Sequence, residues 1–306
     1  MSLMSASATI GAMALVGLKP SVLLRRAADA AARWDGGHGS ATDERPNRQT
    51  IETAWGRIKR DFEKARPKKH KTIYVIHEDD DLLEEEEATD VVDAIRATDK
   101  HFHLDVVLHT FGGRAMASER IAEAILARKR TTAFIPNYAM SGGTVIALAT
   151  RKVVFGQHAS LGPIDIQFGP VPAHDLEQLE AEVGIEHMDS DYALAAIRAR
   201  GIIKKDVAKA CELINPKHKS LAERWFHRCT LAQKLAGGGM DHSERIRYSE
   251  AVELGINATE RRFPHRLYGL VMERRKQLKM LRTLDRELRI VTAHTPRTQG
   301  NPGPAH

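Results

Sequence analysis

The sequence contains few cysteines and few aromatic residues. The two cysteines in 306 residues, Cys211 and Cys229, are too few for the disulfide framework of a small secreted domain. They belong to no CxxC pair, which also argues against a zinc site. We therefore expect both to be buried small side chains and the chain to work in a reducing compartment, the cytoplasm.

Long apolar runs are also lacking near the amino terminus. The apolar stretch there, Ala8–Leu18, has 11 residues, whereas a membrane-spanning helix needs about 20. No basic residues precede it, which argues against a signal peptide. We expect a short helix that packs on the body of the protein or on a partner.

A strong charge imbalance is absent as well. The 46 basic and 40 acidic side chains give a net charge of +6 and an isoelectric point near 9.3. The basic residues gather in Arg57–Lys71 and Arg261–Arg289, with no nucleic-acid-binding motif beside them. We interpret both segments as solvated helix faces and expect no nucleic-acid partner.

Strand and helix patterns alternate through the middle of the chain, and the 42% hydrophobic content supports a large core. Short runs rich in β-branched residues predict strands, and segments with helical spacing of apolar residues lie between them. This alternation predicts a parallel sheet with crossover helices, an α/β fold. The predicted strands are 72–77, 104–110, 131–136 and 152–155, and the predicted helices between them are 91–97, 118–128 and 142–150.

Helical patterns dominate the two flanks, and an acidic loop is predicted over 78–87. We expect a helical arm over residues 1–68, a main domain with a helical lobe over 69–290, and a disordered tail over 291–306. The helices predicted in these flanks are 20–34, 50–64, 176–183, 193–199, 205–213, 221–235, 249–254 and 264–290.

Two strand-to-helix junctions carry the chemical signal. The first, 109–113, reads HTFGG, and the second, 138–144, reads YAMSGGT. Because such junctions of a parallel sheet lie at its carboxyl edge, we expect Gly113 and Ser141 to meet there.

Acyl transfer needs a nucleophile and donors aimed at the developing oxyanion. Ser141 would open a helix, where the N–H of Gly142 lacks an intrahelical partner, and Gly113 could offer a second N–H. Taken singly, these glycines also suit an ordinary turn, tight packing or phosphate binding. However, neither GxGxxG nor a Walker motif is present, and the serine lies outside a G-x-S-x-G motif.

In combination, these motifs resemble a known family. The segments are 110–113 (TFGG), 136–149 (PNYAMSGGTVIALA), 161–167 (LGPIDIQ) and a later one from His242 through 250–255 (EAVELG). They are similar to the serine dehydrogenase proteinase family, a bacterial and archaeal branch of the Clp-protease/crotonase superfamily that is similar to signal peptide peptidase A. The resemblance covers roughly 72–270 and implies a Clp-like fold.

The resemblance also implies roles for individual residues. Ser141 would be the nucleophile, the N–H groups of Gly113 and Gly142 the oxyanion hole, and Asp165 the group that orients a partner. Phe111, Gly142 and Ile166 depart from the proline, alanine and proline that are usual in the family. A homo-oligomer is implied as well. Relatives often carry a membrane anchor; Ala8–Leu18 is too short to indicate one, and a peripheral association with a membrane stays an alternative.

The general base stays open at this stage. His242 aligns with a family histidine, although a surface histidine is an equal alternative. Lys204 and Lys205 are candidates for a Ser-Lys dyad, but most lysines are simply solvated. His109 and His158, near strand ends, are weaker candidates.

We therefore predict a serine peptidase that acts on peptide or protein substrates and needs no cofactor. We expect no metal site, since His101 and His103 lack a third ligand. Two alternatives remain: a crotonase-like acyl-CoA enzyme that shares the oxyanion pair without needing Ser141, and a non-catalytic scaffold.

Overall fold

The computed structural model describes residues 47–79, 81–164, 167–168, 171–215, 221–241 and 244–294. The chain divides after Thr50, and the features below belong to the unit from Ile51 onward, apart from the first turn of one helix. The helix predicted over 20–34 lies outside the described residues.

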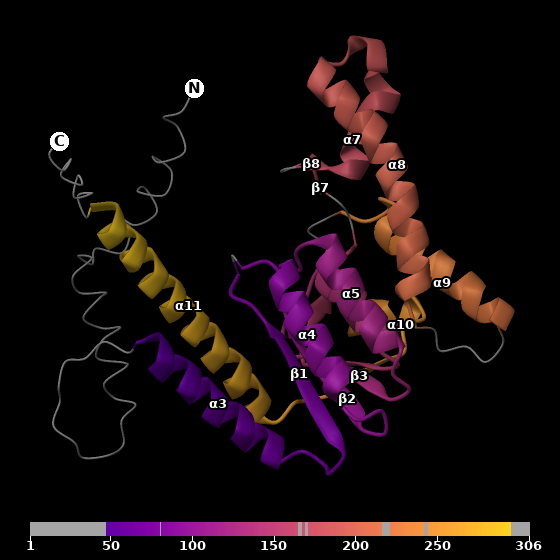
Figure 1. The fold of residues 1–306 in the computed structure, drawn as a ribbon. Coiled ribbons are helices and arrows are strands. Elements are labelled where there is room, and N and C mark those ends of the chain that lie inside the picture. Colours follow the sequence, from indigo (N-terminus) through magenta and orange to yellow (C-terminus); the bar gives the residue numbers. More distant parts are fainter. Residues whose placement is uncertain are drawn as a thin grey trace, which may run out of the picture. The chain divides into compact units, whose positions relative to one another are not determined.

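A parallel sheet of five strands forms the centre of this unit (Figure 1). Its order is β1-β2-β3-β5-β10, and all neighbouring pairs are parallel. The first four strands confirm the predicted ones, whereas the fifth, only three residues long, was not predicted. The strands are β1 His70–Ile76, β2 His103–His109, β3 Thr131–Ile135, β5 Val153–Phe155 and β10 Ala258–Glu260.

Helices cover both faces of the sheet, so the predicted α/β fold is confirmed. One face packs on α4 (Glu85–Ala97), α5 (Ala115–Leu126) and α6 (Gly142–Ala149). Every residue of α6 is buried, as its small and apolar sequence requires. Against the other face pack α3 (Arg48–Lys64) and α11 (His265–His294), which contribute Phe62 and Leu267 among other side chains to a second apolar cluster.

A second, three-stranded sheet lies beside the strand-to-helix junctions. It consists of β4 (Tyr138–Ala139), β6 (Ser160–Leu161) and β9 (Ile246–Arg247). Strand β4 is parallel to β6, and β6 is antiparallel to β9. The pair β7 (Gln167–Phe168) and β8 (Val171–Pro172) follows, and α10 (Tyr248–Glu253) succeeds β9.

The predicted helical lobe consists of α7 (Ala173–Val183), the short η2 (Ile185–His187), α8 (Ser190–Leu213) and α9 (Leu221–Ala236). The prediction of two helices over 193–199 and 205–213 was wrong, because α8 is continuous. Gly201 lies inside it and costs about 1 kcal/mol relative to alanine, but α8 packs on α5, α6, α7 and α9.

Glu85–Glu87, predicted as loop, form the first turn of α4, where carboxylates are favoured.

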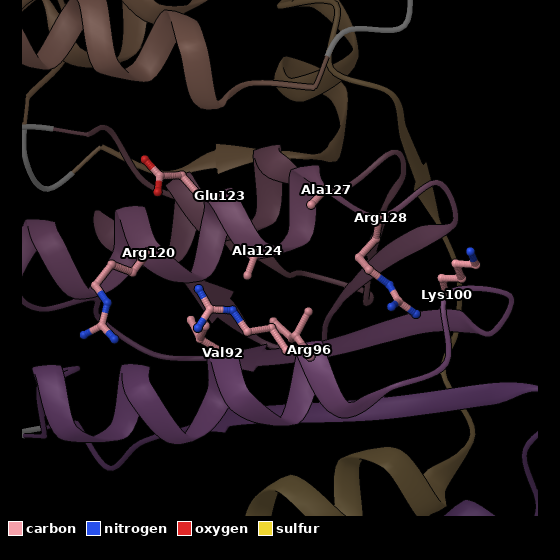
Figure 2. A pocket seen from close by; sticks show the side chains of 9 residues that line it. Val92, Arg96, Lys100, Arg120, Glu123, Ala124, Ala127 and Arg128 are labelled. Carbon is pink, nitrogen blue, oxygen red and sulfur yellow. The ribbon is translucent and has the colours of Figure 1, made fainter.

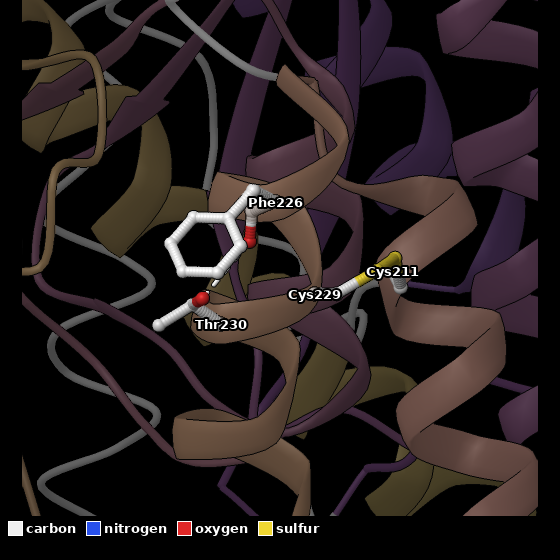
Figure 3. The surroundings of a disulfide bond; sticks show 4 residues. All are labelled: Cys211, Phe226, Cys229 and Thr230. Carbon is white, nitrogen blue, oxygen red and sulfur yellow. Dashed lines mark hydrogen bonds between the residues drawn. A yellow bond between two sulfur atoms is a disulfide. The ribbon is translucent and has the colours of Figure 1, made fainter. Parts of the chain in front are cut away.

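Cys211 and Cys229 form a disulfide that joins α8 to α9, with a Cα–Cα distance of 4.7 Å (Figure 3). The prediction that they are separate buried side chains was wrong, because the helix packing that brings them together cannot be read from their spacing. Such bonds persist mainly in oxidising compartments, which weakens the argument for the cytoplasm.

Among the described residues, no helix is both long and apolar enough to cross a membrane.

Removing this disulfide should lower the stability of the fold. The cysteines are 18 residues apart, and closing a loop of that size restricts the unfolded chain by about 3 kcal/mol. We expect the double variant Cys211→Ala/Cys229→Ala to unfold at a lower denaturant concentration than the wild type. Its free energy of unfolding, measured by circular dichroism, should be lower by about 3 kcal/mol. Reductant should destabilise the wild type and leave the double variant unchanged. Equal stability of the two proteins would contradict the prediction.

Candidate active site

Ser141 occupies a strained turn between β4 and α6. Its φ of +47° and ψ of −116° lie outside the regions that non-glycine residues usually adopt. The half-buried serine precedes the helix, and its carbonyl accepts the N–H groups of Thr144 (2.8 Å) and Val145 (3.2 Å). A strained strand-to-helix turn is how α/β-hydrolases expose a nucleophilic serine, although the sequence motif differs here.

The Gly112–Gly113 turn lies directly against the Ser141 turn. A Cβ atom on Gly112 would come within 2.8 Å of the Gly142 nitrogen and 3.0 Å of the Ser141 Cβ. One on Gly113 would come within 2.3 Å of the Leu83 backbone. Both glycines have positive φ, +98° and +157°, so the turn depends on glycine for space and for conformation. The expected meeting of the two junctions is confirmed.

Two backbone amides converge at this contact. The Gly113 nitrogen lies 3.6 Å from the position that a Cβ atom on Gly142 would occupy. Neither the Gly113 N–H nor the Gly142 N–H donates a hydrogen bond to another residue in the described part of the chain. Two N–H donors beside a nucleophilic serine are the arrangement that stabilises the oxyanion formed during acyl transfer.

The buried hydroxyl of Ser118 explains why glycine stands at position 142. A Cβ atom on Gly142 would lie 2.0 Å from the Ser118 Oγ. Ser118 lies on α5 and donates to the Arg114 carbonyl at 3.2 Å. Its side chain therefore fills the space that the alanine usual in the family would need.

The small sheet gathers three segments that are distant in sequence. Ala139 pairs with Leu161, which pairs with Ile246. Just beyond this row, Gly162 exchanges hydrogen bonds with the Thr144 side chain, at 2.9 and 3.2 Å. The Ile164 N–H donates to the Leu235 carbonyl at the end of α9 (2.7 Å).

The structure does not test every predicted site residue. His242 and Asp165 lie outside the described residues, although the segments that lead to them are described. Lys204 and Lys205 are exposed on α8 and have no hydrogen bond or ion pair with another described residue. The apolar core is contacted by other positions of this helix, Val207 and Ala210 among them.

His109, at the end of β2, is held in its neutral form. It is fully buried, packs on the Tyr138 ring with a centroid distance of 4.2 Å, and its Nδ1 lies 3.4 Å from Asn137. Burial, reinforced by the charge of Arg275, lowers the pKa of His109 to about 4. A buried imidazole of such low basicity makes a poor general base at neutral pH.

The Tyr138 hydroxyl continues this network by donating to Asp79. Asp79 in turn pairs with Arg275 of α11 at 2.7 Å. The Tyr138 hydrogen bond and Arg275 lower the pKa of Asp79, so this carboxylate stays charged. Helix α11 is thereby tied to the edge of the sheet where Ser141 lies.

A possible metal-ligand group was missed from the sequence. His70, His103 and Asp105 have ligand atoms within 4.8 Å of one another, at the amino ends of β1 and β2. Asp105 already pairs with Arg66, and its Oδ2 lies 2.8 Å from His70. Because Arg66 supplies the compensating charge, we interpret the group as an ion-pair cluster. The register of β1 and β2, which the sequence does not show, brings it together.

A cavity of about 430 Å³ lies between α4 and α5, away from both junctions. Its floor is apolar and its rim is basic, and Figure 2 shows Arg96 reaching into the space between the helices. Arg128 is held by the carbonyls of Thr98 (2.7 Å) and Asp99 (2.5 Å). The lining residues are Val92, Ile95, Arg96, Lys100, Arg120, Glu123, Ala124, Ala127 and Arg128. None belongs to either junction.

Asp206 of α8 and Glu119 of α5 interact electrostatically where the two helices pack on each other. Burial, and then the charge of Glu119, raises the pKa of Asp206 to about 6. Burial also raises the pKa of Glu119. The folded state therefore binds more protons than the unfolded chain between about pH 4 and pH 6.

A strained serine beside two unpaired amides at the carboxyl edge of a parallel sheet is typical of one class of protein, the serine hydrolases. The chain belongs to the family of ClpP-like SDH-type serine proteinases, whose family model matches residues 72–290. The resemblance seen in the motifs is thus confirmed.

Two uncharacterized proteins of Methanocaldococcus jannaschii are similar in sequence. MJ1495 is 33% identical over 187 residues, which is 61% of this chain and 62% of the relative. MJ0137 is 33% identical over 193 residues, which is 63% of this chain and 65% of the relative. The match spans less than two thirds of either relative.

Among solved structures, a variant of the 1510-N membrane-bound stomatin-specific protease has 15% identity and a TM-score of 0.43, covering 66% of this chain and 83% of its own. ClpP1 from Listeria monocytogenes has 13% identity and a TM-score of 0.39, covering 64% and 94%. Both likenesses are too distant to support a conclusion about function.

The contact between Ser118 and Gly142 predicts a compensating pair of substitutions. Gly142→Ala should place a methyl group on the Ser118 Oγ, and such overpacking typically costs about 1–3 kcal/mol. Combining it with Ser118→Gly should recover most of the lost stability, because the colliding side chain is then absent. Denaturant unfolding of both variants and of Ser118→Gly measures this. Additive losses would contradict the clash.

The raised pKa of Asp206 predicts a pH-dependent gain from Asp206→Asn. Protonation of the folded wild type contributes stability below about pH 4, and this contribution is lost as the pH rises through about 6. The variant should therefore melt above the wild type at pH 8, by about 2–4 °C per kcal/mol recovered, with a smaller gain at pH 4.5. Asp90→Asn, at an exposed position of α4, is the control. A gain that is independent of pH would overturn this assignment.

Proposed function

We propose that the chain is a serine peptidase that cleaves peptide or protein substrates through an acyl-enzyme on Ser141. The observation that carries the proposal is the convergence of the two junctions, where a strained serine adjoins the amides of Gly113 and Gly142. Membership of a serine proteinase family supports the same reaction.

In this mechanism the Ser141 hydroxyl attacks the substrate carbonyl and passes its proton to a general base. The oxyanion accepts the N–H groups of Gly113 and Gly142, and the amino end of α6 favours its negative charge. The base returns the proton to the leaving amine, and it then activates a water molecule that releases the acyl group. These steps need no cofactor.

We propose His242 as the base and Asp165 as the group that orients it. Ser141 is two residues after Ala139, Asp165 is four after Leu161, and His242 is four before Ile246. Because Ala139, Leu161 and Ile246 form one row of the small sheet, these chain segments leave it at the same end. A segment of four residues spans at most about 14 Å, so His242 and Asp165 can both reach the neighbourhood of Ser141.

The burial pattern of α8 favours His242 over the lysines. Lys204 and Lys205 lie among the exposed positions of this helix, so neither is desolvated. A lysine that acts as a base needs its pKa lowered by burial or by a neighbouring cation. We further propose that the chain assembles as a homo-oligomer and works in the cytoplasm. The disulfide between Cys211 and Cys229 argues against a cytoplasmic location, because such bonds persist mainly in oxidising compartments.

A fluorophosphonate probe, which reacts with activated serines, tests this proposal. We expect the wild type to be labelled and Ser141→Ala to stay unlabelled. His242→Gln should slow labelling on the order of 10²-fold, the contribution expected of a general base. Asp165→Asn should slow it as well, because the imidazole loses its orientation. Gel fluorescence over time gives the rates.

Matched controls separate the alternatives. His101→Gln, at an exposed site outside both junctions, should label like the wild type. Slow labelling of Lys204→Met or Lys205→Met, with normal labelling of His242→Gln, would assign the base to the lysine. A folded wild type that stays unlabelled would argue against the hydrolase. An acyl-CoA-dependent activity insensitive to Ser141→Ala would then favour a crotonase-like enzyme, and a stable oligomer without activity would favour a scaffold.

A further inference from the structure

A chain of hydrogen bonds, buried except at Glu87, runs beneath the Gly112–Gly113 turn. The Gly112 N–H donates to the Thr110 Oγ1 at 2.9 Å. That oxygen lies 2.7 Å from the Nδ1 of His77, and the His77 Nε2 lies 2.7 Å from the Glu87 carboxylate. Thr110 and His77 are 1% and 5% exposed, so water does not compete for the bonds to Thr110, whereas the Glu87 side chain, 37% exposed, ends the chain of bonds at the surface.

The donors and acceptors of this chain have a consistent direction. Because the Glu87 carboxylate accepts, the His77 Nε2 carries a proton and donates it. In neutral His77 the Nδ1 is then an acceptor, and the Thr110 hydroxyl donates to it. The hydroxyl oxygen remains free to accept the Gly112 N–H. Each group thereby fixes the orientation of the next, from α4 to the turn.

Thr110 also contacts the second junction. Its carbonyl accepts the Met140 N–H at 2.9 Å, one residue before Ser141. Its methyl group packs against Gly143, where a Cβ atom would lie 2.8 Å from the Thr110 Cγ2. A shift of Thr110 would therefore move both the oxyanion turn and the serine turn.

We propose that Glu87, His77 and Thr110 are positioning residues that hold the amides of Gly113 and Gly142 at the spacing needed to stabilise the oxyanion. The inference rests on the proposed function and extends it to three side chains outside the predicted triad. The backbone supports the turn as well, because the Leu83 N–H donates to the Gly112 carbonyl (2.8 Å) and the Arg114 N–H to the Leu83 carbonyl (2.9 Å).

The order Glu87, His77, Thr110 has the connectivity of a catalytic triad, but Thr110 is not its nucleophile. The hydroxyl is almost fully buried, and its oxygen already accepts the Gly112 N–H. A substrate carbonyl has no access to it. The same connectivity here fixes the direction of an amide.

Labelling of the whole chain of 306 residues by the fluorophosphonate probe tests the inference. Thr110→Val keeps the size of the side chain and its contact with Gly143 but removes the hydroxyl. We expect labelling to slow on the order of 10- to 100-fold, because misplacing catalytic groups by about 1 Å has effects of that size. Thr110→Ser retains the hydroxyl and should recover most of the rate.

The histidine offers a second, graded comparison. Asn at position 77 can place a polar atom where the Nδ1 lies, toward Thr110, whereas Gln reaches toward the position of the Nε2 and Glu87. His77→Asn should therefore label faster than His77→Gln. Glu87→Gln, which removes the charge but keeps an acceptor, should slow labelling least.

Thr132→Val is the matched control for a merely structural role. Thr132 is also buried and its Oγ1 lies 2.9 Å from a histidine, His103, but on the opposite edge of the sheet. It should lower the melting temperature without slowing the labelling. If Thr110→Val labels as fast as Thr132→Val while the wild type is labelled, the inference is wrong and the proposed function stands. An unlabelled wild type would instead contradict the proposed function, and with it the inference.

Discussion

The close contact between two glycine-bearing turns is the constraint on which the rest of the site depends. Gly112 approaches the Gly142 nitrogen and Ser141 so closely that no side chain fits between them. The contact is possible because parallel strands β2 and β3 end at the same edge of the sheet, where the turn after β2 leads into α5 and the segment after β3 leads through β4 into α6. The strained φ of Ser141 persists because the buried helix α6 and the hydrogen bonds of β4 fix the backbone on both sides.

The surrounding structure supports this contact from three directions. Leu83 and the chain of Glu87, His77 and Thr110 hold the oxyanion turn from the side of α4. The small sheet brings the segments after β6 and before β9 beside the serine turn. Helix α9, joined by its disulfide to α8, accepts the Ile164 N–H at Leu235. The helical lobe thus fixes the segment that leads toward Asp165.

Much of this could be predicted from the sequence, because local patterns determine it. The alternation of strands and helices gave four strands of the main sheet, and the glycines at 113 and 142 with Ser141 pointed to one site. What was missed depends on contacts between distant segments. β10 (Ala258–Glu260) lacks the apolar, β-branched run that predicted the equally short β5, and the bonds from Glu87 through His77 to Thr110 join residues 10 and 33 positions apart. The pairing of Cys211 with Cys229 needs two helices packed side by side, and α8 continues through Gly201 because its flanks are packed.

The central claim is that Gly113 and Gly142 together bind the oxyanion formed at Ser141. A crystal structure of the fluorophosphonate adduct would test this most directly. The account predicts a covalent bond from the Ser141 Oγ to phosphorus and one phosphoryl oxygen within about 3 Å of both amide nitrogens. An adduct on another residue, or a phosphoryl oxygen turned away from these two amides, would contradict it.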